Sequence, residues 1–245
     1  MKRSWHEDLV GKKRLKLSDE LALIYAVEDG DYEYVEVLLL SGMDPNVYDE
    51  KGNTPLHYSA ANGDYEICAL LIKHKGDIFR KNSRAQVPLH LAVVNGNLET
   101  VHYLSDMNSN IQEQDVDGIT PFHLACLHGR MEIVEYFVME QFVPPEISYA
   151  VKGNHPDIVD FLLARGAKPC VRSLYYSIKN NNGKMFKQLI EFFEEPDKIK
   201  YMDMKIPQMI VRYNAWIIKP LYEKKVLSES RISKITDNLD KICIS

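Results

Sequence analysis

The chain has 245 residues, of which 45% are hydrophobic, and its 30 Lys and Arg against 35 Asp and Glu give a formal net charge of −5. A hydrophobic share of this size is normal for a soluble globular protein. The apolar runs are shorter than the roughly 18 residues that a membrane-spanning helix needs, so we expect no membrane insertion.

The N-terminal segment, residues 1–17, is polar and basic. Positions 1–16 hold six Lys and Arg but only two Asp and Glu, and no apolar stretch follows, so we expect no secretory signal. The run Lys12-Lys13-Arg14 resembles a short nuclear import signal, although such runs are more often solvated tails. The sequence therefore predicts a cytoplasmic protein, with nuclear import as the alternative.

Charge differs between the ends and the middle of the chain. Residues 197–245 carry ten Lys and Arg and six Asp and Glu, whereas residues 17–196 carry 14 and 27. An acidic body repels a phosphate backbone, so we expect no nucleic-acid ligand.

An internal repeat occupies the middle of the chain. Gly30, Gly63, Gly96 and Gly129 are evenly spaced, with a period of roughly 33 residues. An apolar residue stands seven positions before each glycine, a small residue four positions before it, and an acidic residue three positions after it. So many positions in phase indicate a repeat protein.

The same register continues in two weaker copies. Asn154 and Asn181 stand in the glycine position, each after a shorter spacing than those between the glycines. Asparagine is the usual substitute for glycine where φ is positive. We therefore expect two degenerate repeats after the four regular ones.

Each repeat predicts a helix, a tight turn, a second helix and an extended loop. In Thr54-Pro55 the hydroxyl can cap the first helix, and proline fits the first helical position. The glycine supplies the left-handed backbone of the turn. The second helix has apolar residues at helical spacing, such as Ile133, Val134, Phe137 and Val138. One such pair cannot bury both faces, so neighbouring pairs must stack.

The repeats resemble those of ankyrin proteins. Thr54-Pro55-Leu56-His57 and Thr120-Pro121-Phe122-His123 are similar to the family signature, and Val87-Pro88-Leu89-His90 is the same with threonine replaced. Asp49-Glu50-Lys51-Gly52 and Asp115-Val116-Asp117-Gly118 are similar to the turn that precedes it. The resemblance implies an all-α solenoid of stacked helix-turn-helix units.

On this basis we expect an ankyrin-repeat domain over residues 18–195, with about six repeats of which the last two are degenerate. No repeat follows it. Residues 196–245 are expected to form a C-terminal helical capping region, in which residues 228–244 have the pattern of an amphipathic helix. The alternative role for that helix is partner binding.

The resemblance also implies a binding surface formed by the loop tips and the exposed face of each first helix. Ala85 and Val87, in the loop of the third repeat, depart from the family pattern, which puts the conformation of that loop in question. Apolar Val94, Ile119 and Leu127 form a candidate contact patch, against the alternative of scattered exposed residues. The expected partner-binding residues are Glu50, Lys51, Asn53, Asn62, Ser83, Arg84, Gln86, Val94, Asn95, Val116, Asp117, Ile119, Leu127 and His128.

Three histidines, His57, His90 and His123, recur once in each of three successive repeats. They occupy equivalent places in those repeats, roughly 10 Å apart, which is too far for one zinc ion. The resemblance implies instead that each bonds to backbone between loops. We expect no metal and no cofactor.

Two functions of different classes remain open. The first is a monomeric adaptor that binds another protein, either within its own cell or as an effector of an intracellular bacterium or virus. The second is a cysteine hydrolase formed by Cys170, His155 and Asp157. His155 and Asp157 stand where repeats place ordinary helix-start residues, and no catalytic motif is present, which favours the adaptor. The four cysteines, Cys68, Cys126, Cys170 and Cys243, lie too far apart in the sequence for a zinc or redox motif, so we expect reduced thiols.

Overall fold

The computed structural model describes residues 21–107, 111–140 and 146–192. Their regular structure is entirely helical, with twelve helices that follow one another as six pairs. The chain divides into two compact units between Ala125 and Cys126, inside α7 (Pro121–Leu127). The expected basic segment 1–17 and almost all of the expected capping region 196–245 lie outside the described residues.

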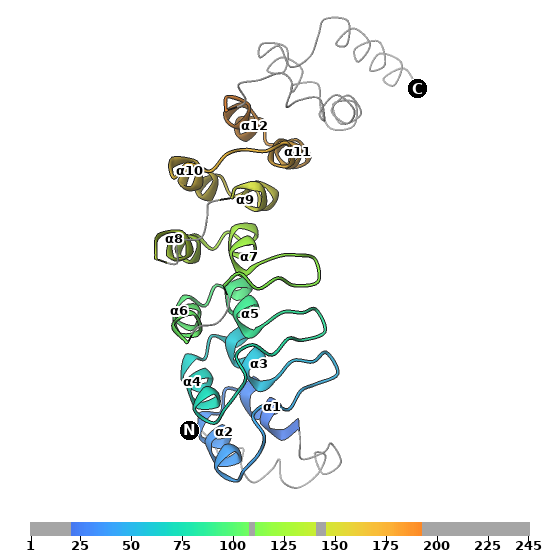
Figure 1. Ribbon diagram of the computed structural model, residues 1–245, viewed down its shortest axis with the longest axis vertical. Helices are drawn as coiled ribbons and strands as arrows, with labels where there is room; N and C mark the ends of the chain where they lie inside the picture. The colour runs from blue at the N-terminus through green and yellow to red at the C-terminus, as the bar shows by residue number, and fades with distance from the viewer. Residues whose placement is uncertain (1–20, 108–110, 141–145, 193–245) are drawn as a thin grey trace, which may run out of the picture. The chain divides into compact units, whose positions relative to one another are not determined.

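In the first unit the helices form two rows (Figure 1). The first helix of each pair packs against its counterparts, α3 against α1 and α5, and the second helices do the same, α4 against α2 and α6. Long loops extend from the row of first helices. The helices are α1 (Ala22–Glu28), α2 (Tyr32–Leu40), α3 (Pro55–Asn62), α4 (Tyr65–Lys73), α5 (Pro88–Asn95) and α6 (Leu98–Asp106).

The second unit repeats the pattern with shorter connections. Here α9 packs against α11, and α10 packs against α8 and α9. The helices after α7 are α8 (Met131–Met139), α9 (Ser148–Gly153), α10 (Pro156–Ala164), α11 (Val171–Lys179) and α12 (Gly183–Ile190).

The turns within the pairs confirm the role predicted for the repeated glycine. Gly63 and Gly96 have φ of 87° and 84°, in the left-handed region that glycine adopts without steric cost. In the degenerate repeats Asn154 and Asn181 adopt φ of 63° and 54°. The two asparagines thus perform the same chain reversal, and the helix pairs survive the loss of glycine.

The residues that precede the glycine by seven positions form the core of the stack. Leu23, Leu56 and Leu89 are fully buried, and Phe122 is 2% exposed. Burial of one such side chain contributes about 2 kcal/mol. Because α3 packs against α1 on one side and α5 on the other, this burial exists only when the pairs are stacked.

Two of the cysteines belong to this core. Cys68 in α4 and Cys126 in α7 are fully buried. Burial raises the pKa of the Cys68 thiol to about 12 and raises that of Cys126 as well. Both are therefore protonated at neutral pH and act as small packing residues.

Candidate functional site

The three long loops of the first unit share one internal structure. At the base of each, a side-chain Oδ1 accepts two backbone N–H groups further along the same loop. For Asp49 the donors are Lys51 and Asn53, at 2.9 and 2.8 Å. Asn82 and Asp115 make the same pairs of bonds, with distances of 2.9 to 3.0 Å. Such bonds fix a turn without help from the helices.

The left-handed residue of each loop is Gly52, Ala85 or Gly118, with φ of 76°, 57° and 73°. Each donates its N–H to the carbonyl of the residue three positions earlier, at 2.9 to 3.0 Å. In the loop of the third repeat, the middle one of these three, alanine stands where the family pattern has glycine. The loop keeps the shared conformation, and Ala85 adopts a backbone geometry that is unfavourable for a residue with a Cβ.

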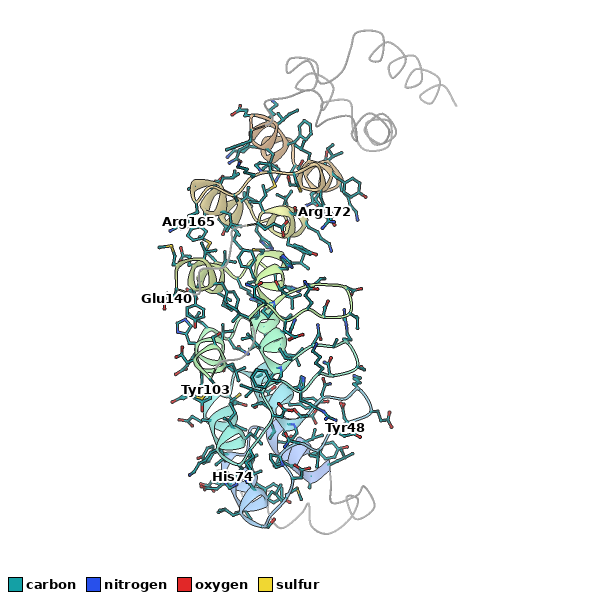
Figure 2. All side chains as sticks on the ribbon, in the orientation of Figure 1. Tyr48, His74, Tyr103, Glu140, Arg165 and Arg172 are labelled. Atoms are coloured by element: carbon teal, nitrogen blue, oxygen red, sulfur yellow. The ribbon has the colours of Figure 1, made fainter. Side chains whose placement is uncertain are left out.

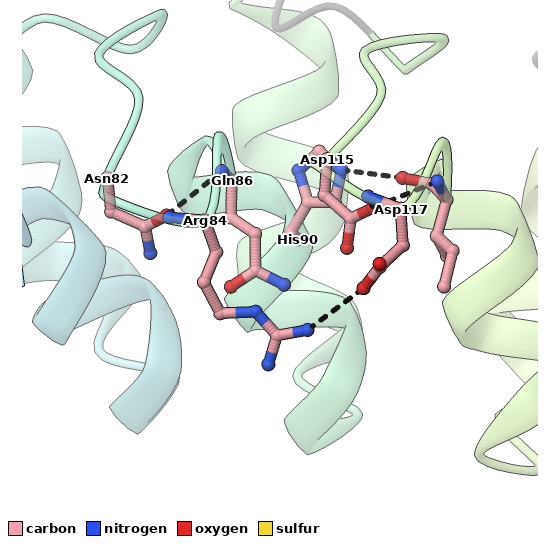
Figure 3. A network of polar contacts seen from close by, with 7 residues as sticks. Asn82, Arg84, Gln86, His90, Asp115 and Asp117 are labelled. Atoms are coloured by element: carbon pink, nitrogen blue, oxygen red, sulfur yellow. Dashed lines mark hydrogen bonds and ion pairs between the residues drawn. The ribbon is translucent and has the colours of Figure 1, made fainter.

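Backbone bonds also join neighbouring loops. Ser83 N donates to the carbonyl of Lys51 at 2.8 Å, and Val116 N donates to the carbonyl of Arg84 at 3.0 Å. The side chains of Arg84 and Asp117 reach toward each other across the same gap, 3.5 Å apart and 62% exposed (Figure 3). The loops therefore form a connected row, and an ion pair this exposed adds little to their stability.

The histidines of the repeat signature connect the loops to the helices. Nδ1 of His57 accepts the Thr54 N–H at 3.1 Å, so the ring proton lies on Nε2, which donates to the Gln86 carbonyl at 2.9 Å. His90 repeats this with Val87 and with the carbonyl of Ile119, at 3.2 and 3.3 Å. The predicted bond from histidine to the backbone of the next loop is confirmed for both.

The expected partner-binding residues fall into three groups by exposure. Asn53, Val94, Ile119 and Leu127 are half-buried, and Gln86 is buried at 8% exposure. The exposed members are Glu50, Lys51, Asn62, Ser83, Arg84, Asn95, Val116, Asp117 and His128.

Gln86 corrects the sequence interpretation. Its N–H donates to Asn82 and its carbonyl accepts from His57, so the residue joins two repeats through its backbone. A buried side chain offers almost no surface to a partner. The loop position looks variable in sequence because its fixed contacts are made by main-chain atoms.

Asn62 and Asn95 have a structural use that the sequence interpretation missed. Asn62 Nδ2 donates to the carbonyl of Val27 at 3.2 Å, and Asn95 Nδ2 donates to that of Ala61 at 2.9 Å. Each amide therefore satisfies a carbonyl at the end of the preceding repeat's first helix. Although both side chains are exposed, their amides already bond to the preceding repeat, which weakens the case for partner contact.

The candidate apolar patch is less exposed than expected. Val94 and Ile119 in the first unit are half-buried, and so is Leu127 in the second unit. The apolar side chain that does stand out on a loop tip is Val116, at 62% exposure. This loop-tip residue is therefore more accessible than the three residues of the patch.

Two residues of the hydrolase alternative, His155 and Cys170, make contacts between neighbouring repeats. His155 Nε2 lies 3.1 Å from the carbonyl of Leu127, and Cys170 Sγ lies 3.2 Å from Ser148 Oγ. Asp157 is exposed in the first turn of α10. Within the described residues no hydrogen bond joins Cys170 to His155 or Asp157, so the structure does not bring these three side chains together as a catalytic group.

The described part of the chain shows neither a metal-binding cluster nor a membrane-spanning helix. No group of three or more His, Cys, Asp or Glu side chains there has a geometry that would hold a metal ion. None of the helices there has the length and apolar character to cross a membrane.

Asn82 fixes its loop through two backbone N–H groups, and the sequence interpretation does not include it. Asp49 and Asp115 belong to turns that resemble the family motif, whereas the loop between them has asparagine in the equivalent position of its repeat. The regular spacing of Asp, Asn and Asp was the available signal, because both residue types accept through Oδ1.

The comparison with family models agrees with the stacked helix pairs. Ankyrin repeats, three copies, match residues 23–115 and 89–173. A search of curated proteins finds no match to the chain. The family matches together run from residue 23 to residue 173, more than half of the sequence. With the helix pairs, the left-handed turns and the connected loops, they establish that this chain belongs to the ankyrin-repeat family.

Proposed function

We propose that this chain is a protein-binding adaptor whose first unit recognises a partner protein with its loop tips. Ankyrin repeats are generally protein-interaction modules, and the fold is typically non-catalytic. One observation supports the loop tips as the contact region. Their backbone groups are used in bonds within and between loops, whereas the side chains of Lys51, Arg84 and Val116 remain exposed.

A connected row of loops is well suited to recognition. Ordering a flexible loop on binding costs free energy, in addition to about 0.5–1.5 kcal/mol for each side chain that is immobilised. Loops already fixed by Asp49, Asn82 and Asp115 avoid much of that loss. Mixed charges and exposed apolar side chains, among them Val116, then define which partner fits.

The proposal is tested by capture of proteins from a eukaryotic lysate, followed by mass spectrometry. Wild type is compared with a loop-tip variant, Glu50→Lys with Asp117→Lys. The control, Glu66→Lys with Glu99→Lys, lies on the second helices α4 and α6. All four residues are exposed, and both variants change the charge equally. Proteins that bind the loop tips should be kept by wild type and the control and lost by the loop-tip variant.

If both variants retain the same proteins, recognition by the loop tips is wrong. The alternative in which the chain is an effector directed at a host protein uses the same surface. It is distinguished by the identity of the captured protein and not by a different variant.

A further inference from the structure

The first helices of the last two repeats carry the same short motif. Tyr149-Ala150-Val151-Lys152 ends near the C-terminus of α9, and Tyr176-Ser177-Ile178-Lys179 ends α11. Each tyrosine lies five positions and each lysine two positions before the left-handed asparagine of its turn. Because α9 packs against α11, the two motifs occupy equivalent places on neighbouring helices.

Lysine and tyrosine side chains of the two motifs meet in space. The ammonium of Lys152 lies 5.6 Å from the ring centroid of Tyr149 and 5.8 Å from that of Tyr176. The Tyr176 ring in turn packs edge-on against Tyr175, with centroids 5.4 Å apart. The two motif tyrosines are half-buried, whereas Lys152 is exposed, so the rings position the ammonium at the surface.

The charged side chains of α9 and α11 are all basic. Helices α9 and α11 contain three basic side chains, Lys152, Arg172 and Lys179, and no acidic one. All three are exposed, and Arg172 is labelled on α11 in Figure 2. Within the described residues no carboxylate lies in ion-pair distance of any of them. The carboxylate at the start of α9, Glu146, accepts the N–H of Ser148 at 3.2 Å.

The first repeat shows that this charge is particular to the second unit. In α1 the equivalent motif is Tyr25-Ala26-Val27-Glu28, with an exposed acid in the place of the lysines. The acids of α10, Asp157 and Asp160, are on a second helix of a pair. The same structural position therefore carries opposite charges in the first and the last two repeats.

We propose that the surface formed by Tyr149, Lys152, Arg172, Tyr176 and Lys179, which we call the α9–α11 surface, binds an acidic segment of a partner protein. The inference rests on the proposed function and names the chemistry of one partner segment. Carboxylates pair with the three exposed cations, and the tyrosine rings offer apolar area and hydroxyl groups to the intervening residues. A long phosphate backbone is disfavoured because residues 17–196 as a whole carry 27 acidic and 14 basic side chains.

The test uses the full chain and a fluorescent peptide of alternating glutamate and glycine, followed by anisotropy. The surface variant is Lys152→Glu with Lys179→Glu. Its control is Lys184→Glu with Lys187→Glu, which makes the same charge change at exposed residues of α12. A lysine–glycine peptide and single-stranded polyuridine RNA of equal length are compared with the acidic peptide.

We expect wild type and the control to bind the acidic peptide equally, the surface variant to bind about tenfold or more weakly, and added salt to weaken binding. The inference is wrong if the acidic peptide does not bind, if both variants lose the same affinity, or if polyuridine binds as well and depends on the same lysines. These outcomes leave the loop-tip capture experiment unaffected, so the two proposals fail separately. Circular dichroism and thermal unfolding check that both variants remain folded.

Discussion

The imidazole of His57 joins two consecutive repeats, because Nε2 lies 2.9 Å from the carbonyl oxygen of Gln86 while Nδ1 accepts the backbone N–H of Thr54. Both bonds require the neutral ring with its proton on Nε2. A second proton would reach Nδ1, face the Thr54 N–H and place a charge in a fully buried site. Burial accordingly lowers the pKa of His57, and it lowers that of His90.

This linkage predicts that the protein loses stability in mild acid. The pKa of His57 is lowered in the folded state from its ordinary value of 6.5, so the unfolded chain binds the proton first as the pH falls. The stability contributed by the neutral ring is complete above about pH 6.5 and declines as the pH drops toward the lowered pKa. Urea unfolding at pH 7.5 and pH 5.5 should show a lower midpoint at the lower pH.

The variant His57→Gln should reduce this difference between the two pH values, because it removes one of the buried titrating groups. His74→Gln, at the end of α4, serves as the control and should keep the wild-type difference. An unchanged difference in His57→Gln would mean that the acid sensitivity arises elsewhere.

Ala85 predicts a stabilising exchange in the loop of the third repeat. Its φ of 57° lies in the left-handed region, which costs an alanine roughly 1–2 kcal/mol relative to glycine. Ala85→Gly should therefore raise the free energy of unfolding by about 1 kcal/mol, after the added entropy of the unfolded chain is subtracted. The matched control, Ala61→Gly within α3, should lower it by a similar amount, since glycine weakens a helix interior. A loss of stability in both variants would contradict the argument.

The regular parts of the fold could be predicted because their signals are local. Gly63 and Pro55 mark the end and the start of a helix by their own backbone preferences, and they recur with a fixed period. The asparagines Asn154 and Asn181 could be placed for the same reason, since their φ values follow from residue type.

The candidate site was harder to predict, because contacts between repeats decide which loop side chains are free to meet a partner. Gln86 occupies a position that resembles a variable tip, but its backbone lies between Asn82 and His57 and its side chain is buried. Nothing in the sequence around Asn62 indicates a hydrogen-bond partner, because the carbonyl that it binds belongs to Val27 of the previous repeat. No local pattern reveals such partners.

The connected loops predict that Asn82 matters more for stability than Arg84. Asn82 accepts two backbone N–H groups and donates to Asn53 Oδ1 at 2.9 Å. Asn82→Ala leaves the exposed N–H of Arg84 and two partly buried groups, the N–H of Gln86 and Oδ1 of Asn53, without this partner and should cost about 2 kcal/mol. Arg84→Ala removes an ion pair that is 62% exposed on both sides and should cost about 0.5 kcal/mol or less. Chemical denaturation of the two variants measures both values, and equal losses would show that the side-chain bonds of Asn82 do not hold the loop.

The second helix of the third pair contains a buried hydroxyl without a hydrogen bond. Thr100 in α6 is fully buried, and its Oγ1 has no partner among the described residues. The equivalent positions in the preceding and the following repeat are Ile67 and Ile133, which are 3% and 2% exposed. The site is therefore an apolar one that holds a polar atom, and burial of such an atom costs about 1–3 kcal/mol. Thr100→Val keeps the shape of the side chain and should raise the free energy of unfolding by about 1 kcal/mol.

Thr120→Val is the matched control for that exchange. Thr120 is also buried, but its Oγ1 accepts the backbone N–H of His123 at 3.4 Å at the start of α7. Loss of this cap should lower the free energy of unfolding by about 1 kcal/mol. Urea denaturation of the two variants at neutral pH should therefore shift the midpoint in opposite directions. A lower midpoint for Thr100→Val would show that its hydroxyl has a partner, such as a buried water, whose removal outweighs the apolar gain.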